Sequence, residues 1–134
     1  MIQVNIAAVL VSGVASMAIG YIWYSKAVFG NKWIKLIGYG GEKMDNSQMM
    51  KTYSIMFLVS LIMAYILAIF IHYAGAYSLV LGAKTGLWAW IGFVVPTTLA
   101  NQLFSKKPLE LYGIEVGHHL VNLLVIGAIL GSWY

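Results

Sequence analysis

Residues 52–83 read TYSIMFLVSLIMAYILAIFIHYAGAYSLVLGA and contain no Asp, Glu, Lys or Arg. The intervals 1–25, 85–105 and 116–134 are likewise free of these residues. At about 1.5 Å of rise per residue, a helix in each interval is long enough to cross a hydrocarbon core of about 30 Å. Backbone amides cannot stay unpaired in lipid, and the intervals lack the alternation of barrel strands. The sequence therefore predicts one all-α domain over residues 1–134, an integral membrane four-helix bundle with spans at about 2–25, 50–75, 84–105 and 115–133.

The composition excludes several classes of protein. Hydrophobic residues make up 61% of the chain and charged residues 9%, whereas a soluble domain is about 25% charged. A soluble enzyme, a nucleic-acid binder and a disordered tail are therefore excluded. The net charge of +4 comes from lysines alone, and arginine, the residue best suited to bidentate phosphate contacts, is absent. Because cysteine is also absent, the chain has no disulfide, thiolate metal site or thiol nucleophile.

The lysines lie on one side of the predicted spans. Five of them fall in the loop 26–51 and two in the loop 106–115, whereas Lys84 stands alone on the opposite side. Cytoplasmic loops are enriched in lysine and arginine. We therefore expect a multi-pass protein of the cell membrane with both lysine-rich loops in the cytoplasm and both termini outside.

A short amphipathic helix is predicted over residues 28–37, inside the first loop. Its apolar residues recur at helical spacing from Phe29, while its lysines fall elsewhere on the helical wheel. Such a helix lies in the membrane interface with its lysines toward lipid phosphates. We expect headgroup contacts from Lys32, Trp33 and Lys35.

Small residues mark one face of the first span and the end of the last. They are Ala8, Ser12, Ser16 and Gly20, followed by Gly127 and Gly131. Small side chains let helices approach closely, either within one bundle or between copies of a homo-oligomer. A bundle of this size has little interior for a pore, so transport would favour a dimer or larger assembly.

The third span carries a proline followed by polar residues. Pro96 removes a backbone donor and kinks the helix, and the hydroxyls of Thr97 and Thr98 can reach back to the carbonyls of the preceding turn. Thr97 and Asn101 share a face, with Gln102 beside them. This stripe lines a hydrated path, or it forms interhelical hydrogen bonds of about 0.6 kcal/mol per pair.

The last span opens with ionisable residues at helical spacing. Glu115, His118, His119 and Asn122 are three or four residues apart and can meet on one face. They form a proton-sensitive cluster facing Asn101 and Gln102, or interfacial histidines that satisfy nearby polar groups. Glu-x-x-His is also a di-metal motif, but no other span supplies an acid. We therefore predict no metal, no cofactor and no catalytic residue, since enzyme signatures are also absent. The remaining enzymatic alternative is a membrane-embedded enzyme built around Glu115 and the two histidines.

Several motifs resemble one known family. They are GYIWYS at residues 20–25, WIGFVVP at 90–96, GHHLV at 117–121 and GAILGSW at 127–133. In order and spacing they are similar to the DUF1761 family of small integral membrane proteins, which have no assigned activity. Lys26 stands where that family usually has proline, which implies a less rigid turn after the first helix. The resemblance implies an architecture and no mechanism.

The sequence favours a homo-oligomeric transporter or channel for a small solute or ion. Its polar path would consist of Thr97, Asn101, Gln102, Glu115, His118, His119 and Asn122, with mobility at the Pro96 kink. The alternative is a structural or accessory membrane subunit, or a lipid-binding protein without transport activity. Expected partners are the lipid bilayer, further copies of the chain and possible docking to another membrane protein, with no nucleic acid.

Overall fold

The computed structural model describes residues 3–25, 27–37 and 46–134, and every regular element in these ranges is helical. The elements are α1 (Ile6–Trp23), α2 (Gly30–Ile37), α3 (Asn46–Ala74), α4 (Leu79–Ala89), η1 (Trp90–Val94), α5 (Val95–Ser105) and α6 (Leu109–Ser132). Helices α4, η1 and α5 follow one another without interruption and together make up the third long helix. With α1, α3 and α6, the described residues thus form four long apolar helices. By length and composition each of the four is able to cross a membrane. The predicted all-α architecture with four long helices is confirmed.

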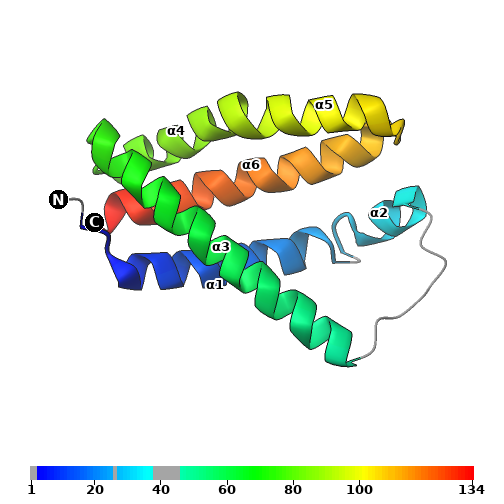
Figure 1. Ribbon diagram of the computed structural model, residues 1–134, viewed down its shortest axis with the longest axis horizontal. Helices are drawn as coiled ribbons and strands as arrows, with labels where there is room; N and C mark the ends of the chain where they lie inside the picture. The colour runs from blue at the N-terminus through cyan, green and yellow to red at the C-terminus, as the bar shows by residue number, and fades with distance from the viewer. Residues whose placement is uncertain (1–2, 26, 38–45) are drawn as a thin grey trace.

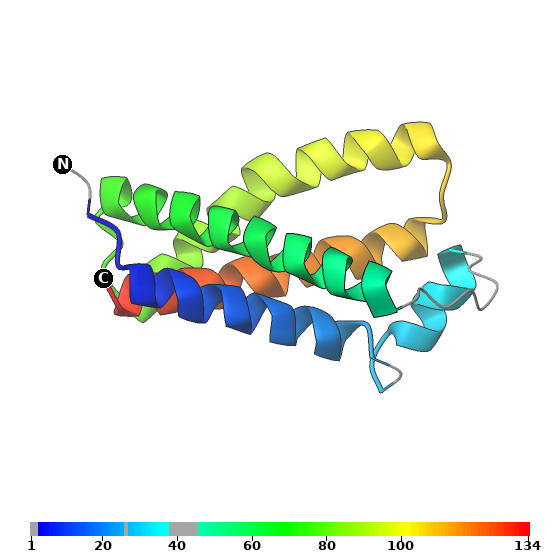
Figure 2. The same cartoon turned by 60° about the horizontal axis from the view of Figure 1, so that its bottom comes forward.

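The long helices run up and down in chain order (Figure 1). Both termini and the turn between α3 and α4 lie at one end of the molecule, whereas α2 and the turn between α5 and α6 lie at the other (Figures 1 and 2). Helix α1 packs against α3 and α6, and α4 packs against α6. The described lysines therefore concentrate at the α2 end, and Lys84 lies toward the end with the termini.

Three helices begin earlier than the predicted spans, and α3, which begins at Asn46, is the first of them. Helix α4 begins at Leu79, because the Ser78 hydroxyl caps it by accepting a hydrogen bond from the Leu81 amide at 3.0 Å. Lys84 is thus part of a helix and not of a loop. Helix α6 begins directly after Pro108, so Glu110 and Glu115 both belong to it.

The short helix α2 occupies most of the segment for which a helix is predicted. Lys32 forms an ion pair with Glu110 of α6, so this lysine contacts protein, whereas Lys35 is exposed. The Trp33 ring lies 5.1 Å from that of Tyr24, measured between centroids. The position of α2 at a lipid surface stays a prediction.

Helices α4 and α6 meet through glycines. Gly82 and Gly86 of α4 are buried, and a Cβ atom added at either would overlap a backbone carbonyl of α6. A Cβ at Gly131 would lie 2.8 Å from the Gly82 Cα. Only glycine allows backbones to approach this closely, and the contact gains dispersion energy along its whole length. We call Gly82, Gly86, Gly127 and Gly131 the glycine seam.

The small-residue face of α1 also packs inside the chain. Ala8, Ser12 and Ser16 are buried, and the Ser16 hydroxyl forms a hydrogen bond of 3.1 Å with the Ser60 hydroxyl of α3. A Cβ at Gly20 would lie 3.5 Å from the His118 Nε2 atom of α6. The predicted small-residue positions therefore bring helices of a single copy together.

The glycine seam predicts a sharp difference between two Gly→Ala substitutions. Gly82→Ala places a methyl group against the Gly127 carbonyl, so the helices must separate. We expect a loss of about 1–3 kcal/mol in the free energy of unfolding. Gly113→Ala is the control, because its Cβ meets no atom within 4 Å. There we expect a gain of roughly 0.5–1 kcal/mol from helix propensity. Unfolding in detergent micelles, followed by circular dichroism, measures both, and equal effects would contradict the seam.

Candidate functional site

The third long helix is irregular at its centre. Residues Trp90–Val94 form a π-helical turn, in which the Val95 amide donates to the Trp90 carbonyl five residues back. Pro96 follows within the first turn of α5 and has no N–H to donate. A π turn next to a proline widens and redirects a helix, and such turns often occur at functional sites. The direction of α5 therefore differs from that of α4.

Threonine hydroxyls satisfy the carbonyls at this break. The Thr97 hydroxyl donates to the Phe93 carbonyl at 2.5 Å, and the Thr98 hydroxyl donates to the Val94 carbonyl at 2.6 Å. The prediction that these threonines reach back to the preceding turn is confirmed. Such bonds allow an interrupted helix to exist in an apolar environment.

Beyond the break, α5 stands away from α6 (Figure 2). The two helices enclose a cleft of about 80 Å³, enough for a few water-sized groups, since water occupies about 30 Å³ in the liquid. The cleft lies toward the end of the molecule that carries most lysines. It is lined by Thr98, Asn101, Gln102, Ser105, Lys107, Tyr112, Glu115, Val116 and His119.

Two side chains hold the frame of the cleft. The buried Gln102 donates from Nε2 to the carbonyls of Lys107 and Pro108 at 2.5 and 3.2 Å, which closes the turn between α5 and α6. The Tyr112 hydroxyl donates to the Val95 carbonyl at 3.2 Å and lies 3.2 Å from the Thr98 hydroxyl. The first turns of α6 are therefore joined to both ends of α5.

Two indoles fix the rotation of α6 around Glu115. Trp23 Nε1 donates to the Ile114 carbonyl at 2.9 Å, and Trp90 Nε1 donates to the Val116 carbonyl at 2.9 Å. These carbonyls flank Glu115 in the sequence and are approached from α1 and from the π turn. These bonds hold the α6 backbone on both sides of Glu115 from two elements outside that helix.

The structure brings together four of the residues predicted for a polar path. Asn101, Gln102, Glu115 and His119 line the cleft, whereas Thr97 is exposed and bonds to its own helix. The other two predicted residues point elsewhere. His118 faces α1, with its ring 5.3 Å from that of Tyr24, and Asn122 is buried beside Met63 of α3.

Several residues that line the cleft were not among the predicted site residues, although a different helical spacing identifies them. Thr98, Asn101, Gln102 and Ser105 are spaced as one helical face, and Tyr112 shares a face with Glu115. Thr97 had been placed in the stripe because it lies four residues before Asn101. The choice between Thr97 and Thr98 depends on the rotation of α5 after the π turn, which the sequence does not display.

The cleft offers a distinct set of chemical groups. Its lining residues carry one carboxylate, one imidazole, one ammonium group, two amides and several hydroxyls. Among the residues that the structure describes, no three His, Cys, Asp or Glu side chains lie close enough to hold a metal ion. Such a set is suited to a small polar or positively charged solute, which it can surround with oxygen atoms.

Comparison with known proteins gives one match. The family model described as "Protein of unknown function (DUF1761)" matches residues 7–131, which include every residue of the cleft. Neither the curated proteins nor the solved structures contain a match to this chain. The resemblance inferred from the sequence motifs is confirmed.

The link between Tyr112 and α5 is testable by hydrogen exchange. Tyr112→Phe removes the hydroxyl that joins α6 to the Val95 carbonyl. We expect a loss of about 1 kcal/mol in stability, with faster amide exchange in α5 and little change in α4. Tyr65→Phe on the exposed side of α3 is the matched control. Exchange that rises equally in α4 and α5 would show that the hydroxyl does not hold α5 locally.

Proposed function

We propose that this chain, which belongs to the DUF1761 family, is an integral membrane transport protein that binds a small polar or positively charged solute between α5 and α6. The proposal has two parts: insertion of the four long helices into a bilayer, and use of the cleft as the solute site. The observations that support each part are independent.

The outer surface of the bundle supports membrane insertion. Large apolar side chains on the outward face of α3, such as Leu58 and Ile62, are more than half exposed. The same holds for Phe93 and Leu103 on the third long helix. In water, a continuous apolar surface of this extent drives association. In a bilayer it contacts lipid at no cost, and the helices pair their own backbone groups.

The main support for the solute site is that some polar side chains in the cleft have hydrogen-bond partners in the protein and others have none among the described residues. The Gln102 Nε2 atom and the hydroxyls of Thr98 and Tyr112 donate hydrogen bonds to carbonyls of the protein. Within the described part of the chain, no hydrogen bond involves the side chains of Asn101, Glu115 or His119, although all three line the cleft. Unsatisfied polar groups in a spanning helix are costly and are retained where they are used. These three side chains are therefore the ones available to a solute.

The break in the third helix supports movement of α5. Transporters often bind their solutes beside interrupted helices, whose halves move relative to each other. Here the glycine seam holds α4 on α6, and the π turn with Pro96 separates α4 from α5. Bending at the break widens or closes the cleft without separating α4 from α6.

One argument for the accessory-subunit alternative no longer holds. It relied on small-residue faces that were free to dock a partner helix. Ser12 and Ser16 are buried against the other helices of the same chain, and Gly127 lies in the glycine seam. A homo-oligomer is likewise not required to complete the cleft, because one copy supplies all of its walls.

Loss of the Glu115 carboxylate tests the solute site. Proteoliposomes with the purified protein are assayed for flux of Na⁺, K⁺, NH₄⁺ and protons. We expect flux of at least one of them and, with Glu115→Gln, a decrease of roughly tenfold or more, since the charge-assisted contact is lost. Glu110→Gln is the matched control, because it removes the same charge outside the cleft lining. If the wild-type protein shows no flux of any of the four ions, or if both variants show equal flux, the proposal is refuted.

Membrane insertion and orientation have a separate test. The chain contains no cysteine, so a single introduced cysteine reports its own position. We expect Tyr134→Cys to react with an impermeant maleimide on intact cells, and Lys35→Cys to react only after permeabilisation. Both residues are exposed. The opposite pattern would invert the orientation, and labelling of both from the same side would contradict the up-and-down arrangement in a bilayer.

A further inference from the structure

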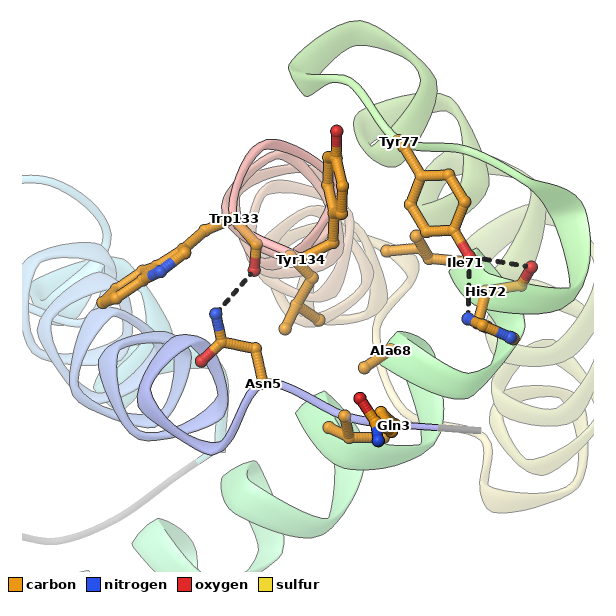
Figure 3. A pocket seen from close by; sticks show the side chains of 10 residues that line it. Gln3, Asn5, Ala68, Ile71, His72, Tyr77, Trp133 and Tyr134 are labelled. Carbon is orange, nitrogen blue, oxygen red and sulfur yellow. Dashed lines mark hydrogen bonds between the residues drawn. The ribbon is translucent and has the colours of Figure 1, made fainter. Parts of the chain in front are cut away.

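A second cavity lies at the other end of the molecule, where both termini meet the turn between α3 and α4 (Figure 3). Its volume is about 500 Å³, within the range of small-molecule sites. Its walls come from residues 3–5, the last turns of α3 and α6, and the turn after α3. The glycine seam and the hydrophobic core separate it from the α5–α6 cleft.

The inner wall of this cavity is apolar. Ile71 and Leu130 are 2% and 3% exposed, and Ala68 packs against the same core. Aromatic rings stand at the rim, where the centroids of Tyr77 and Tyr134 lie 4.6 Å apart. A compact apolar group placed here would contact carbon atoms on several sides.

The polar wall contains the Gln3 amide and a hydrogen-bonded pair, Tyr77 and His72. The Tyr77 hydroxyl and His72 Nδ1 are 2.7 Å apart and share one hydrogen (Figure 3). If Tyr77 donates, its oxygen can still accept and His72 Nε2 carries a hydrogen. If His72 donates, Tyr77 keeps its hydrogen and Nε2 can accept. In either tautomer the Tyr77 hydroxyl keeps one position free, as an acceptor or as a donor, so a group that both donates and accepts, such as a hydroxyl or an amide, can pair with it.

The ten side chains that line the cavity in the described part of the chain supply no counter-charge for an ion. None of its ten lining residues is Asp, Glu, Lys or Arg, and the Asn5 amide is already bonded to the Trp133 carbonyl and the Ala8 amide. Placing a charged group against the apolar wall without a partner charge would be costly. We propose that this cavity binds an uncharged amphiphile with a compact apolar body and a hydroxyl or amide end.

A matched pair of probes tests the requirement for neutrality. Saturation-transfer NMR on the protein in phosphatidylcholine nanodiscs compares 2-naphthol with naphthalene-2-carboxylate, which has the same ring system and a negative charge. We expect saturable binding of 2-naphthol and binding of the carboxylate at least tenfold weaker, with empty nanodiscs as the background. Equal binding of both probes, or no binding of 2-naphthol above background, would overturn the proposal.

Two variants locate the binding in the cavity. Ala68→Phe fills the inner wall and should abolish the signal, and Tyr77→Phe should weaken binding roughly fivefold through loss of one hydrogen bond. Tyr65→Phe, which lies outside the cavity on α3, should bind like the wild type. Should Ala68→Phe fail to fold, Tyr77→Phe alone decides. Unchanged binding in Tyr77→Phe and in a folded Ala68→Phe would place the probe elsewhere.

A competitor identifies the source of the natural ligand. Monodecanoylglycerol has a hydroxyl end and an apolar chain and partitions into the bilayer. Displacement of 2-naphthol by this lipid at low mole fraction would assign the cavity to neutral lipids. Displacement only by a water-soluble amphiphile such as benzyl alcohol would assign it to solutes that arrive from water. Displacement by neither would contradict the proposed ligand class.

Discussion

The contact between Gly82 and Gly127 determines the geometry on which the rest of the structure depends. It brings the α4 and α6 backbones together so closely that neither position can accept a Cβ atom. Once α4 is held there, the π turn and Pro96 set the direction in which α5 leaves it, and the hydrogen bonds of Gln102 and Tyr112 hold α5 in place. Beyond this break α5 stands away from α6 (Figure 2), which leaves room between them for Glu115 and His119. The change of direction creates that room, so the cleft results from a tight contact and a break in the same helix.

The long helices are predictable from the sequence, but their ends are only partly so. Charge-free intervals identify all four, because a charged side chain in lipid is costly. The same criterion misplaced the start of α4, since Lys84 was taken as a boundary although the Ser78 cap begins the helix earlier. That error also concealed a glycine pair. Gly82 and Gly86 flank Lys84, so they did not fall within a single predicted span.

The candidate site, like the ends of the helices, was only partly predictable from the sequence. Helical spacing places Glu115 and His119 on one face of α6, and this face does line the cleft. Spacing within one helix does not reveal which neighbour each side chain meets. His118 is adjacent in sequence but contacts α1, because α6 packs between α1 and the third long helix. The rotation of each helix is fixed by contacts such as that of Trp23 with the Ile114 carbonyl, which have no signature in the sequence.

The polar side chains of this chain fall into two groups: those that form hydrogen bonds within the described part of the protein and those that do not. Thr97 and Ser60 donate to carbonyls of their own helices, and Gln102 closes a turn, so these residues satisfy polar groups of the bundle itself. Glu115 and His119 receive no such partner among the described residues, although indole contacts hold the α6 backbone on either side of Glu115. A group that is oriented by its surroundings but left unbonded is prepared for a ligand. Ser12, His118 and Asn122 also carry buried polar atoms without a partner among the described residues, but Glu115 and His119 differ from them in lining the cleft.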